Sequence, residues 1–282
     1  MSQGATLAAA RPALRRRAGS RTNLTSGSSL GLGIAVTWFS LLVLIPLAAL
    51  VATAAGGGWD EYIKTLTNEQ TLAALKLTVG QSFVVTAINV VIGTTIAWVL
   101  VRDQFFGKRI LDVIIDIPFA LPTIVAGLVL LTLYGKGSPL GLEWANTELS
   151  VPLALAFVTL PFVVRTVQPV LEELDADVEE AAASLGAGRV TIFRRLILPS
   201  LAPAIAAGAA LSFARAIAEY GSLVLLSGNL PFHTEVVSVR VLSFIEGGNT
   251  AAAASVATVM LAVALIVIVA LDLVQGWVAR RG

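Results

Sequence analysis

Six long runs of the chain contain no Asp, Glu, Lys or Arg, and charged segments separate them. The uncharged runs are 22–59, 77–101, 117–135, 149–164, 196–214 and 247–271. A helix needs about 20 mostly apolar residues to cross the hydrocarbon core of a bilayer. The pattern therefore predicts an all-α membrane protein with six transmembrane helices. The expected spans are 31–55, 72–101, 110–135, 150–171, 200–227 and 250–277.

Composition agrees with a lipid environment. Hydrophobic residues make up 56% of the 282 residues and charged residues only 13%. A soluble domain carries about 25% charged residues, so this chain has too little charge to cover a water-facing surface. The net charge of +1 gives no reason to expect a nucleic-acid partner. With no cysteine and a single histidine, His233, the chain offers no disulfide and no thiolate or histidine-based metal site.

Lys and Arg are distributed unequally between the two sides of the predicted bundle. With the N-terminus inside, the outer segments hold only Lys64, Lys136 and Arg240. The inner segments hold Arg11, Arg15, Arg16, Arg17, Arg21, Arg102, Lys108, Arg109, Arg165, Arg189, Arg194, Arg195, Arg280 and Arg281. Positive charge favours the cytoplasmic side, so both termini are expected there. Residues 1–28 are expected to form a disordered basic cytoplasmic tail and residues 29–282 the transmembrane domain.

The inner connection at 172–198 is longer than the others and has its own pattern. It opens with six acidic residues, Glu172, Glu173, Asp175, Asp177, Glu179 and Glu180. Three alanines at 181–183 favour a helix, and Gly186 and Gly188 can end it in a tight turn. A second helix can begin near Arg189, and Pro199 can open the next span, where its missing amide hydrogen costs little. We expect a helix–turn–helix across the inner mouth of the bundle.

The same segment resembles the EAA loop of the permease subunits of ABC importers. That motif is Glu-Ala-Ala, three residues, Gly, nine residues, an aliphatic residue, any residue, and Leu-Pro. The matching positions are Glu180, Ala181, Ala182, Gly186, Leu198 and Pro199, with Leu196 at the aliphatic position. An ordinary amphipathic connector is the alternative interpretation, because Glu-Ala-Ala alone is common in helices. The six-position match in one register favours the EAA loop.

The resemblance implies a type I ABC-importer permease fold and a division of labour between subunits. In that family the EAA loop is a coupling helix seated on a separate ATPase, whose closure switches the permease between inward-open and outward-open states. This chain has no Gly-x4-Gly-Lys-Ser/Thr phosphate loop. We therefore expect no catalytic site, no metal and no cofactor in the chain, with ATP and Mg bound by the partner.

Further stretches are similar to the T subunits of bacterial sulfate/thiosulfate permeases. They are 117–123, 160–170, 213–221 and 228–231. The resemblance implies import of sulfate or thiosulfate across the bacterial inner membrane. It also implies a homologous second permease subunit, two ATPase copies and an extracytoplasmic sulfate/thiosulfate-binding protein. A molybdate/tungstate permease shares several of these phrases and remains an alternative, as does, more remotely, a secondary anion transporter.

Three polar residues within the predicted spans are candidates for the translocation pathway. Arg215 and Glu219 lie four residues apart, and so on one helix face, where Arg215 can offer its guanidinium to an oxyanion. A neutralised pair that fixes helix packing is the alternative. Asn89 lies mid-span and can either line the pathway or form a helix–helix hydrogen bond. Asp112 and Asp116 are expected at the inner boundary or paired with Lys108 or Arg109, in a span that Pro118 and Pro122 should bend.

Overall fold

The computed structural model describes residues 26–279, and every regular element in that range is a helix. The chain divides into two compact units, residues 1–48 and residues 49–282. Most of the predicted basic tail, 1–25, lies outside the described residues, as do Arg280 and Arg281.

The first unit consists of one apolar helical segment. It comprises α1 (Ser26–Phe39), the π-helical turn η1 (Ser40–Leu44) and the start of α2 (Ile45–Gly56). Residues 28–56 are long and apolar enough to cross a membrane, in the place of the predicted span 31–55. Large side chains along the segment, such as Leu30 and Trp38, are exposed.

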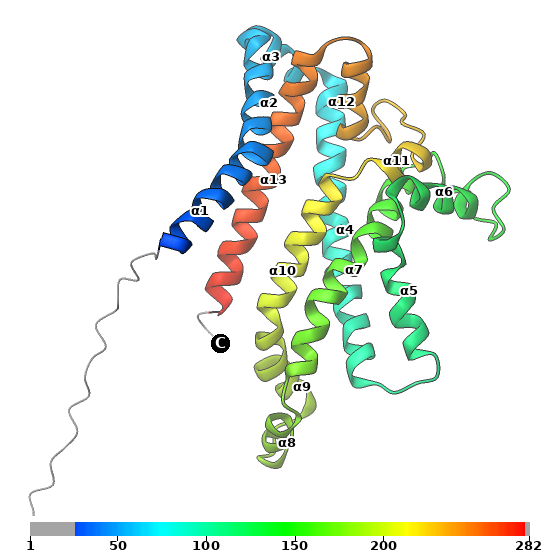
Figure 1. The fold of residues 1–282 in the computed structure, drawn as a ribbon. Helices are drawn as coiled ribbons and strands as arrows, with labels where there is room; N and C mark the ends of the chain where they lie inside the picture. The colour runs from blue at the N-terminus through cyan, green and yellow to red at the C-terminus, as the bar shows by residue number, and fades with distance from the viewer. Residues whose placement is uncertain (1–25, 280–282) are drawn as a thin grey trace, which may run out of the picture. The chain divides into compact units, whose positions relative to one another are not determined.

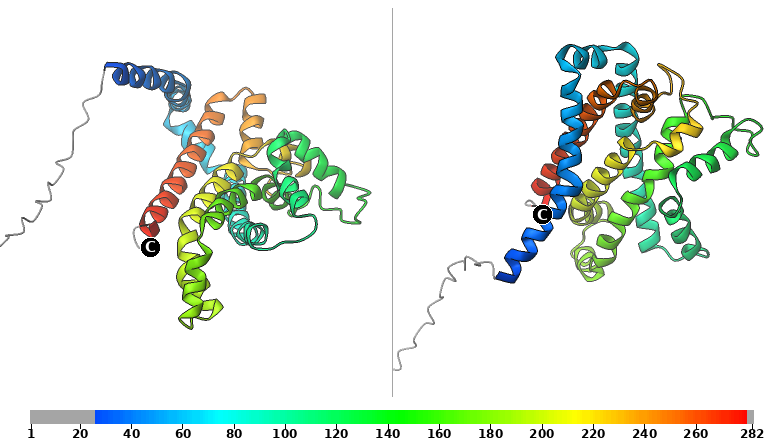
Figure 2. Two further views of the ribbon diagram at one scale, coloured as in Figure 1. Left: turned by 60° about the horizontal axis from the view of Figure 1, so that its bottom comes forward. Right: turned by 45° about the horizontal axis from the view of Figure 1, so that its top comes forward.

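Four long helices form the body of the second unit. They are α4 (Glu69–Arg102), α7 (Ser150–Glu173), α10 (Leu198–Ile217) and α13 (Thr250–Ala279). α4 packs along both α7 and α10, α7 packs along α10, and α10 packs along α13. α4, α7 and α10 stay side by side when the molecule is turned (Figures 1 and 2). Five described segments are each long and apolar enough to cross a membrane. Four of them lie in this unit: Glu69–Arg102, Ser150–Glu173, Arg189–Ile217 and Thr250–Leu273.

Shorter helices close the end of this bundle that is uppermost in Figure 1. α3 (Gly58–Thr67) leads into α4, and α12 (Val237–Glu246) leads into α13. The Asn68 side chain caps α4 by accepting hydrogen bonds from the backbone N–H groups of Gln70 and Thr71. Across this end, the Gln70 amide donates to Glu235, at 2.7 Å.

The third predicted span, 110–135, is not one helix. It consists of α5 (Lys108–Ala120) and α6 (Thr123–Tyr134), and the chain direction bends by 118° between them. The break falls at Leu121 and Pro122, because Pro122 cannot donate a backbone hydrogen bond and forces the residue before it out of the helical region. Pro118, by contrast, lies within α5. The two prolines that predicted a bend therefore behave differently.

The fifth predicted span, 200–227, also differs. α10 ends at Ile217, and after three non-helical residues a separate helix, α11 (Gly221–Leu226), begins and packs against α6. The expectation that the helix continues to Ser227 is wrong. Two glycines make the contact possible: a Cβ on Gly221 would lie 2.2 Å from Thr123 Oγ1, and one on Gly127 would lie 2.8 Å from Ser222 Cα.

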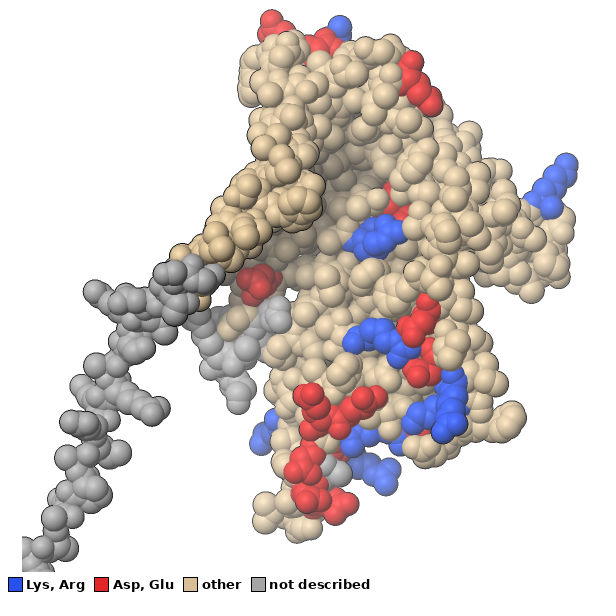
Figure 3. Space-filling model, viewed as in Figure 1, with Lys and Arg blue, Asp and Glu red and all other residues tan. Residues whose placement is uncertain are grey.

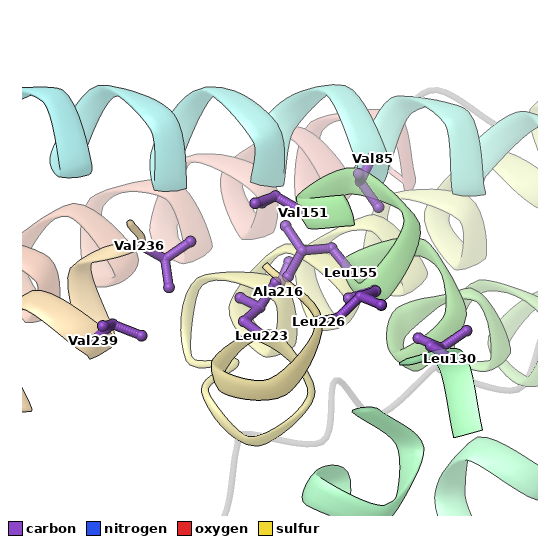
Figure 4. Packing of buried hydrophobic residues seen from close by; sticks show 10 residues of the cluster. Val85, Leu130, Val151, Leu155, Ala216, Leu223, Leu226, Val236 and Val239 are labelled. Atoms are coloured by element: carbon purple, nitrogen blue, oxygen red, sulfur yellow. The ribbon is translucent and has the colours of Figure 1, made fainter. Parts of the chain in front are cut away.

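The two larger of three buried apolar clusters hold most of the described helices together. The first joins α4, α6, α7, α10, α11 and α12 (Figure 4), and its members are Val85, Leu130, Val151, Ala154, Leu155, Ala216, Leu223, Leu226, Val236 and Val239. The second lies nearer the opposite end, and its members are Ala97, Leu100, Ile115, Val163, Val164, Val167, Leu171, Ile197, Leu201 and Ala204. Ile197 belongs to the loop that resembles the EAA segment, so the second cluster anchors that loop to the bundle.

Gly93 sets the distance between α4 and α7. A Cβ at this position would lie 2.8 Å from Val163 Cβ, closer than carbon atoms can approach. Gly93→Ala must therefore push the helices apart, and overpacking of this kind costs about 1–3 kcal/mol. We expect a lower midpoint of thermal unfolding for the detergent-solubilised variant.

The matched control is Gly80→Ala in the same helix, where an added Cβ meets nothing within 4 Å. Because alanine favours helix more than glycine does, this variant should be at least as stable as the parent. Equal midpoints for the two variants would show that Gly93 does not limit the approach of α7.

Candidate functional site

The loop between α7 and α10 folds into a capped helix and a tight turn. α8 (Ala176–Ser184) begins after Asp175, whose carboxylate accepts a hydrogen bond from the backbone N–H of Asp177 at 3.0 Å. It ends in a Schellman motif, in which the Gly186 N–H donates to Ala183 O and the Ala187 N–H donates to Ala182 O. Gly186 has φ +87°, the left-handed conformation that this motif requires.

The second half of the loop is continuous with the following span. α9 (Arg189–Ile192) passes through a π-helical turn, η2 (Phe193–Ile197), directly into α10. Residues 189–217 therefore form one uninterrupted 29-residue segment that can cross a membrane. The span begins eleven residues before the expected position, because Pro199 occupies the first turn of α10 without breaking the helical path. A displacement of α9 is thus carried directly into α10.

The seven residues of the EAA-like motif are placed differently along this loop. Glu180 and Ala181 on α8 are exposed and Ala182 is half-buried. Gly186 forms the turn, Leu196 is half-buried in η2, and Leu198 and Pro199 are exposed at the start of α10. Glu180 and Ala181 are thus accessible on the surface of α8.

Charge is concentrated at this end of the molecule. Figure 3 shows red and blue atoms gathered over its lower part, where Figure 1 places α8 and α9, while most of the remaining surface in this view is tan. Between the end of α7 and the end of η2, the exposed acidic residues are Glu172, Glu173, Asp175, Asp177 and Glu180, and the exposed basic residues are Arg189, Arg194 and Arg195. This surface is polar enough to meet water or a soluble partner.

Arg215 and Glu219 form an ion pair at the end of α10. Arg215 Nη1 lies 2.6 Å from Glu219 Oε2, and the Glu219 side chain is fully buried while that of Arg215 is 28% exposed. The other carboxylate oxygen, Oε1, accepts hydrogen bonds from both the backbone N–H and the hydroxyl of Ser222, each at 2.8 Å. Glu219 therefore also caps the start of α11, a role that the i, i+4 spacing does not reveal.

Asn89 is buried between two helices. Its amide donates to Thr159 Oγ1 at 2.8 Å, and Thr159 in turn donates to Leu155 O at 2.7 Å. Asn89 therefore joins α4 to α7, and in this conformation it does not line an accessible surface. A hydrogen bond between spans contributes about 0.6–2 kcal/mol.

Arg165 is the centre of a polar cluster that the sequence did not reveal. Its Nε lies 2.7 Å from Asp116 Oδ1, and its Nη1 lies 2.6 Å from Asp112 Oδ1 and from Gln168 Oε1. The expectation that the two aspartates pair with Lys108 or Arg109 is wrong. Asp112 and Asp116 face α7 instead, because one turn of α5 places both on the side that packs against that helix. The cluster joins α5 to α7.

Metal ligands do not gather in the part of the chain that the structure describes: no three His, Asp or Glu side chains there are placed to hold an ion. The sole histidine, His233, is exposed in the connection between α11 and α12. The features left to carry function are the α8–α9 loop and the partly exposed Arg215.

A family model described as the binding-protein-dependent transport system inner membrane component matches residues 89–281, which include α8, α9 and Arg215. The chain belongs to this family of transport permeases.

One similar sequence is the sulfate transport system permease protein CysT of Escherichia coli (strain K12). It is 41% identical over 263 residues, which is 90% of this chain and 95% of the relative. The CysT of Synechocystis sp. is also 41% identical, over 254 residues, covering 88% of this chain and 89% of the relative. Both alignments thus extend over nearly the whole of each protein.

Solved structures share the fold at low sequence identity. A chain of a bacterial ABC transporter involved in the import of the acidic polysaccharide alginate matches with a TM-score of 0.74 at 16% identity, covering 88% of this chain and 94% of that one. A chain of the bacterial alginate ABC transporter in complex with an alginate-pentasaccharide-bound periplasmic protein matches with a TM-score of 0.72 at 17% identity, covering 86% and 91%. The helical arrangement is therefore that of an ABC-importer permease.

The unequal burial of the ion pair predicts unequal effects of removing its two charges. Arg215→Gln leaves the buried Glu219 carboxylate without its cation, and breaking a buried pair costs about 3–5 kcal/mol. Glu219→Gln keeps an acceptor oxygen for Ser222 and leaves a cation that water can reach. We therefore expect Arg215→Gln to lower the midpoint of thermal unfolding in detergent more than Glu219→Gln.

The double variant Arg215→Gln, Glu219→Gln is the control, because it removes both charges together. It should recover most of the stability that Arg215→Gln loses. A double variant less stable than Arg215→Gln alone would contradict the burial argument.

Proposed function

We propose that this chain is a transmembrane permease subunit of an ATP-driven importer for sulfate or thiosulfate. The observation that carries the proposal is the α8–α9 turn, whose left-handed Gly186 stands in register with the glycine of the EAA motif. The 41% identity to proteins named as sulfate permeases supports the choice of substrate. Molybdate and tungstate, oxyanions of the same charge, remain the alternative substrates.

In the proposed mechanism, the α8–α9 loop is the segment on which a separate ATPase subunit acts. An ATPase bound to the exposed face of α8 displaces α8 and α9 when ATP binding closes the ATPase dimer. Because α9, η2 and α10 are one helix, the displacement passes into the span that carries Arg215. The ATPase supplies the catalytic site and binds ATP and Mg, and this chain supplies no residue to hydrolysis.

The proposed complex contains a homologous second permease subunit, two ATPase copies and an extracytoplasmic binding protein. The solved alginate transporter with its periplasmic protein supports the last of these. The loop and both termini face the cytoplasm in this proposal, supported by the excess of Lys and Arg in the segments on that side. The membrane is then the bacterial inner membrane.

Arg215 is the proposed contact for the anion. Its partly exposed guanidinium can donate hydrogen bonds to an oxyanion while Glu219 neutralises most of its charge. This favours weak, transient binding, which suits a pathway that must release its substrate. Asn89 is the weaker candidate, because its buried hydrogen bond to Thr159 must break before it can reach the pathway.

Two matched glycine substitutions test the loop. Gly186→Ala places a Cβ on a residue at φ +87°, which costs about 1–2 kcal/mol for a non-glycine residue and opposes the turn. We expect this variant to reach the membrane at normal abundance and to lose at least tenfold in sulfate uptake, while the ATPase remains active.

The control, Gly188→Ala, changes a glycine at φ −70° with open space around its Cβ. Its uptake should stay within about twofold of the parent, since alanine adopts this backbone conformation freely. Equal uptake by the two variants would show that transport does not depend on the left-handed turn at Gly186.

The substrate is tested by uptake of radiolabelled sulfate in a strain that lacks this gene and carries it on a plasmid. We expect excess unlabelled sulfate or thiosulfate to compete with the label and molybdate to compete weakly. Competition by molybdate alone, at concentrations where thiosulfate has no effect, would assign the permease to molybdate.

A further inference from the structure

The α8–α9 loop is fastened to a third span, α4, to which it has no covalent connection. Arg102, in the last turn of α4, forms an ion pair between its Nη2 and Glu179 Oε1 on α8. The two residues are 77 positions apart in the chain. Both side chains are about three-quarters buried, with 24% and 23% of their surfaces exposed. This contact is therefore shielded from water more than an ordinary surface pair.

An aromatic contact lies next to the ion pair. Trp98, one turn before Arg102 on α4, meets Phe193 of η2 edge to face, with ring centroids 5.7 Å apart. The Arg102 guanidinium carbon lies 5.6 Å from the centre of the Trp98 ring. Such ring–ring and cation–ring contacts are attractive and directional. The last turn of α4 thus holds both halves of the loop, α8 through Arg102 and η2 through Trp98.

An open groove of about 460 Å³ lies beside these contacts. Trp98, Glu179, Phe193 and Ile197 line it together with Arg189, Val190 and Ile192. η2 also meets α4 through the second buried apolar cluster, which includes Ala97, Leu100 and Ile197. The Arg102–Glu179 ion pair is the described polar link between α4 and α8. Whether α8 moves together with α4 therefore depends on this ion pair.

We propose that Arg102 and Trp98 form a joint through which α4 follows the α8–α9 loop during transport. This inference rests on the proposed function, in which an ATPase displaces the loop. The chain itself connects the loop only to α7 and α10. α4 packs along both of those helices, with Gly93 in tight contact with Val163 on α7, and the joint adds a direct link from α4 to the part of the loop that the ATPase displaces. Arg102 and Trp98 are thus positioning residues through which α4 moves together with α7 and α10.

The charge of the joint is tested in the complete transporter, reconstituted in vesicles with its ATPase and binding protein. Arg102→Gln and Glu179→Gln should each leave assembly and ATP hydrolysis intact and lower the sulfate molecules moved per ATP at least fivefold. The charge-reversed pair Arg102→Glu, Glu179→Arg should recover at least half of that ratio. An unchanged ratio in both single variants, or no recovery in the reversed pair, would overturn the joint.

The control is Arg109→Gln. Arg109 lies at the same end of the bundle, is exposed, and forms no ion pair with any residue that the structure describes. Its ratio of transport to hydrolysis should equal that of the parent. A fall equal to that of Arg102→Gln would mean that any lost positive charge at this end has the same effect, and would overturn the assignment to Arg102.

A covalent replacement tests whether the joint stays closed throughout the cycle. The natural chain has no cysteine, so Arg102→Cys with Glu179→Cys can be linked by a short bifunctional thiol reagent in an otherwise cysteine-free chain. We expect the linked transporter to regain transport that the unlinked double variant has lost. A linked transporter that moves no more sulfate per ATP than the unlinked double variant would show that holding α4 and α8 together does not restore transport, contrary to the proposal.

The parent complex separates this inference from the function on which it rests. If the parent imports no sulfate when supplied with ATP, the proposed function fails and the ratios cannot be measured. If the parent imports sulfate with ATP and Arg102→Gln retains the same ratio, the proposed function stands and the joint alone fails.

Discussion

Backbone hydrogen bonding without water is the constraint on which this architecture depends. Inside an apolar bundle, every N–H group released by a broken helix must find another acceptor. α10 ends at Ile217, and the Glu219 carboxylate accepts the N–H and hydroxyl of Ser222, with Arg215 neutralising its charge. That arrangement lets α11 begin against α6, and the apolar cluster shared by α6, α7, α11 and α12 forms around it.

At the opposite end of the bundle, the same need for hydrogen-bond partners is met by a polar connection. There the connection between α7 and α10 is polar, capped by Asp175 at its start and by the Schellman turn at Gly186. η2 continues into α10 without a break, so the loop is rigid where it joins the span. The result is a polar connection that continues directly into a long apolar helix, as the proposed coupling to a separate ATPase requires.

Sequence could predict those features that depend on local pattern. Uncharged runs located the long helices, and Gly186 was found because the left-handed turn after Ala181–Ala183 needs glycine. Features that depend on distant residues could not be predicted in this way. Arg165 finds Asp112 and Asp116 across 53 and 49 positions, and Arg102 finds Glu179 across 77. The end of α10 was missed because Ala218 and Tyr220 do not forbid a helix; tertiary contacts of Glu219 and Gly221 decide it.

In the proposed function, a separate ATPase drives transport through the Glu180–Pro199 loop. The most direct measurement is sulfate uptake into vesicles containing the purified complex, with binding protein outside, ATP inside and all ion gradients collapsed. The account predicts uptake that requires both ATP and the binding protein. Uptake without ATP that follows an imposed proton or sodium gradient would contradict it and identify a secondary transporter.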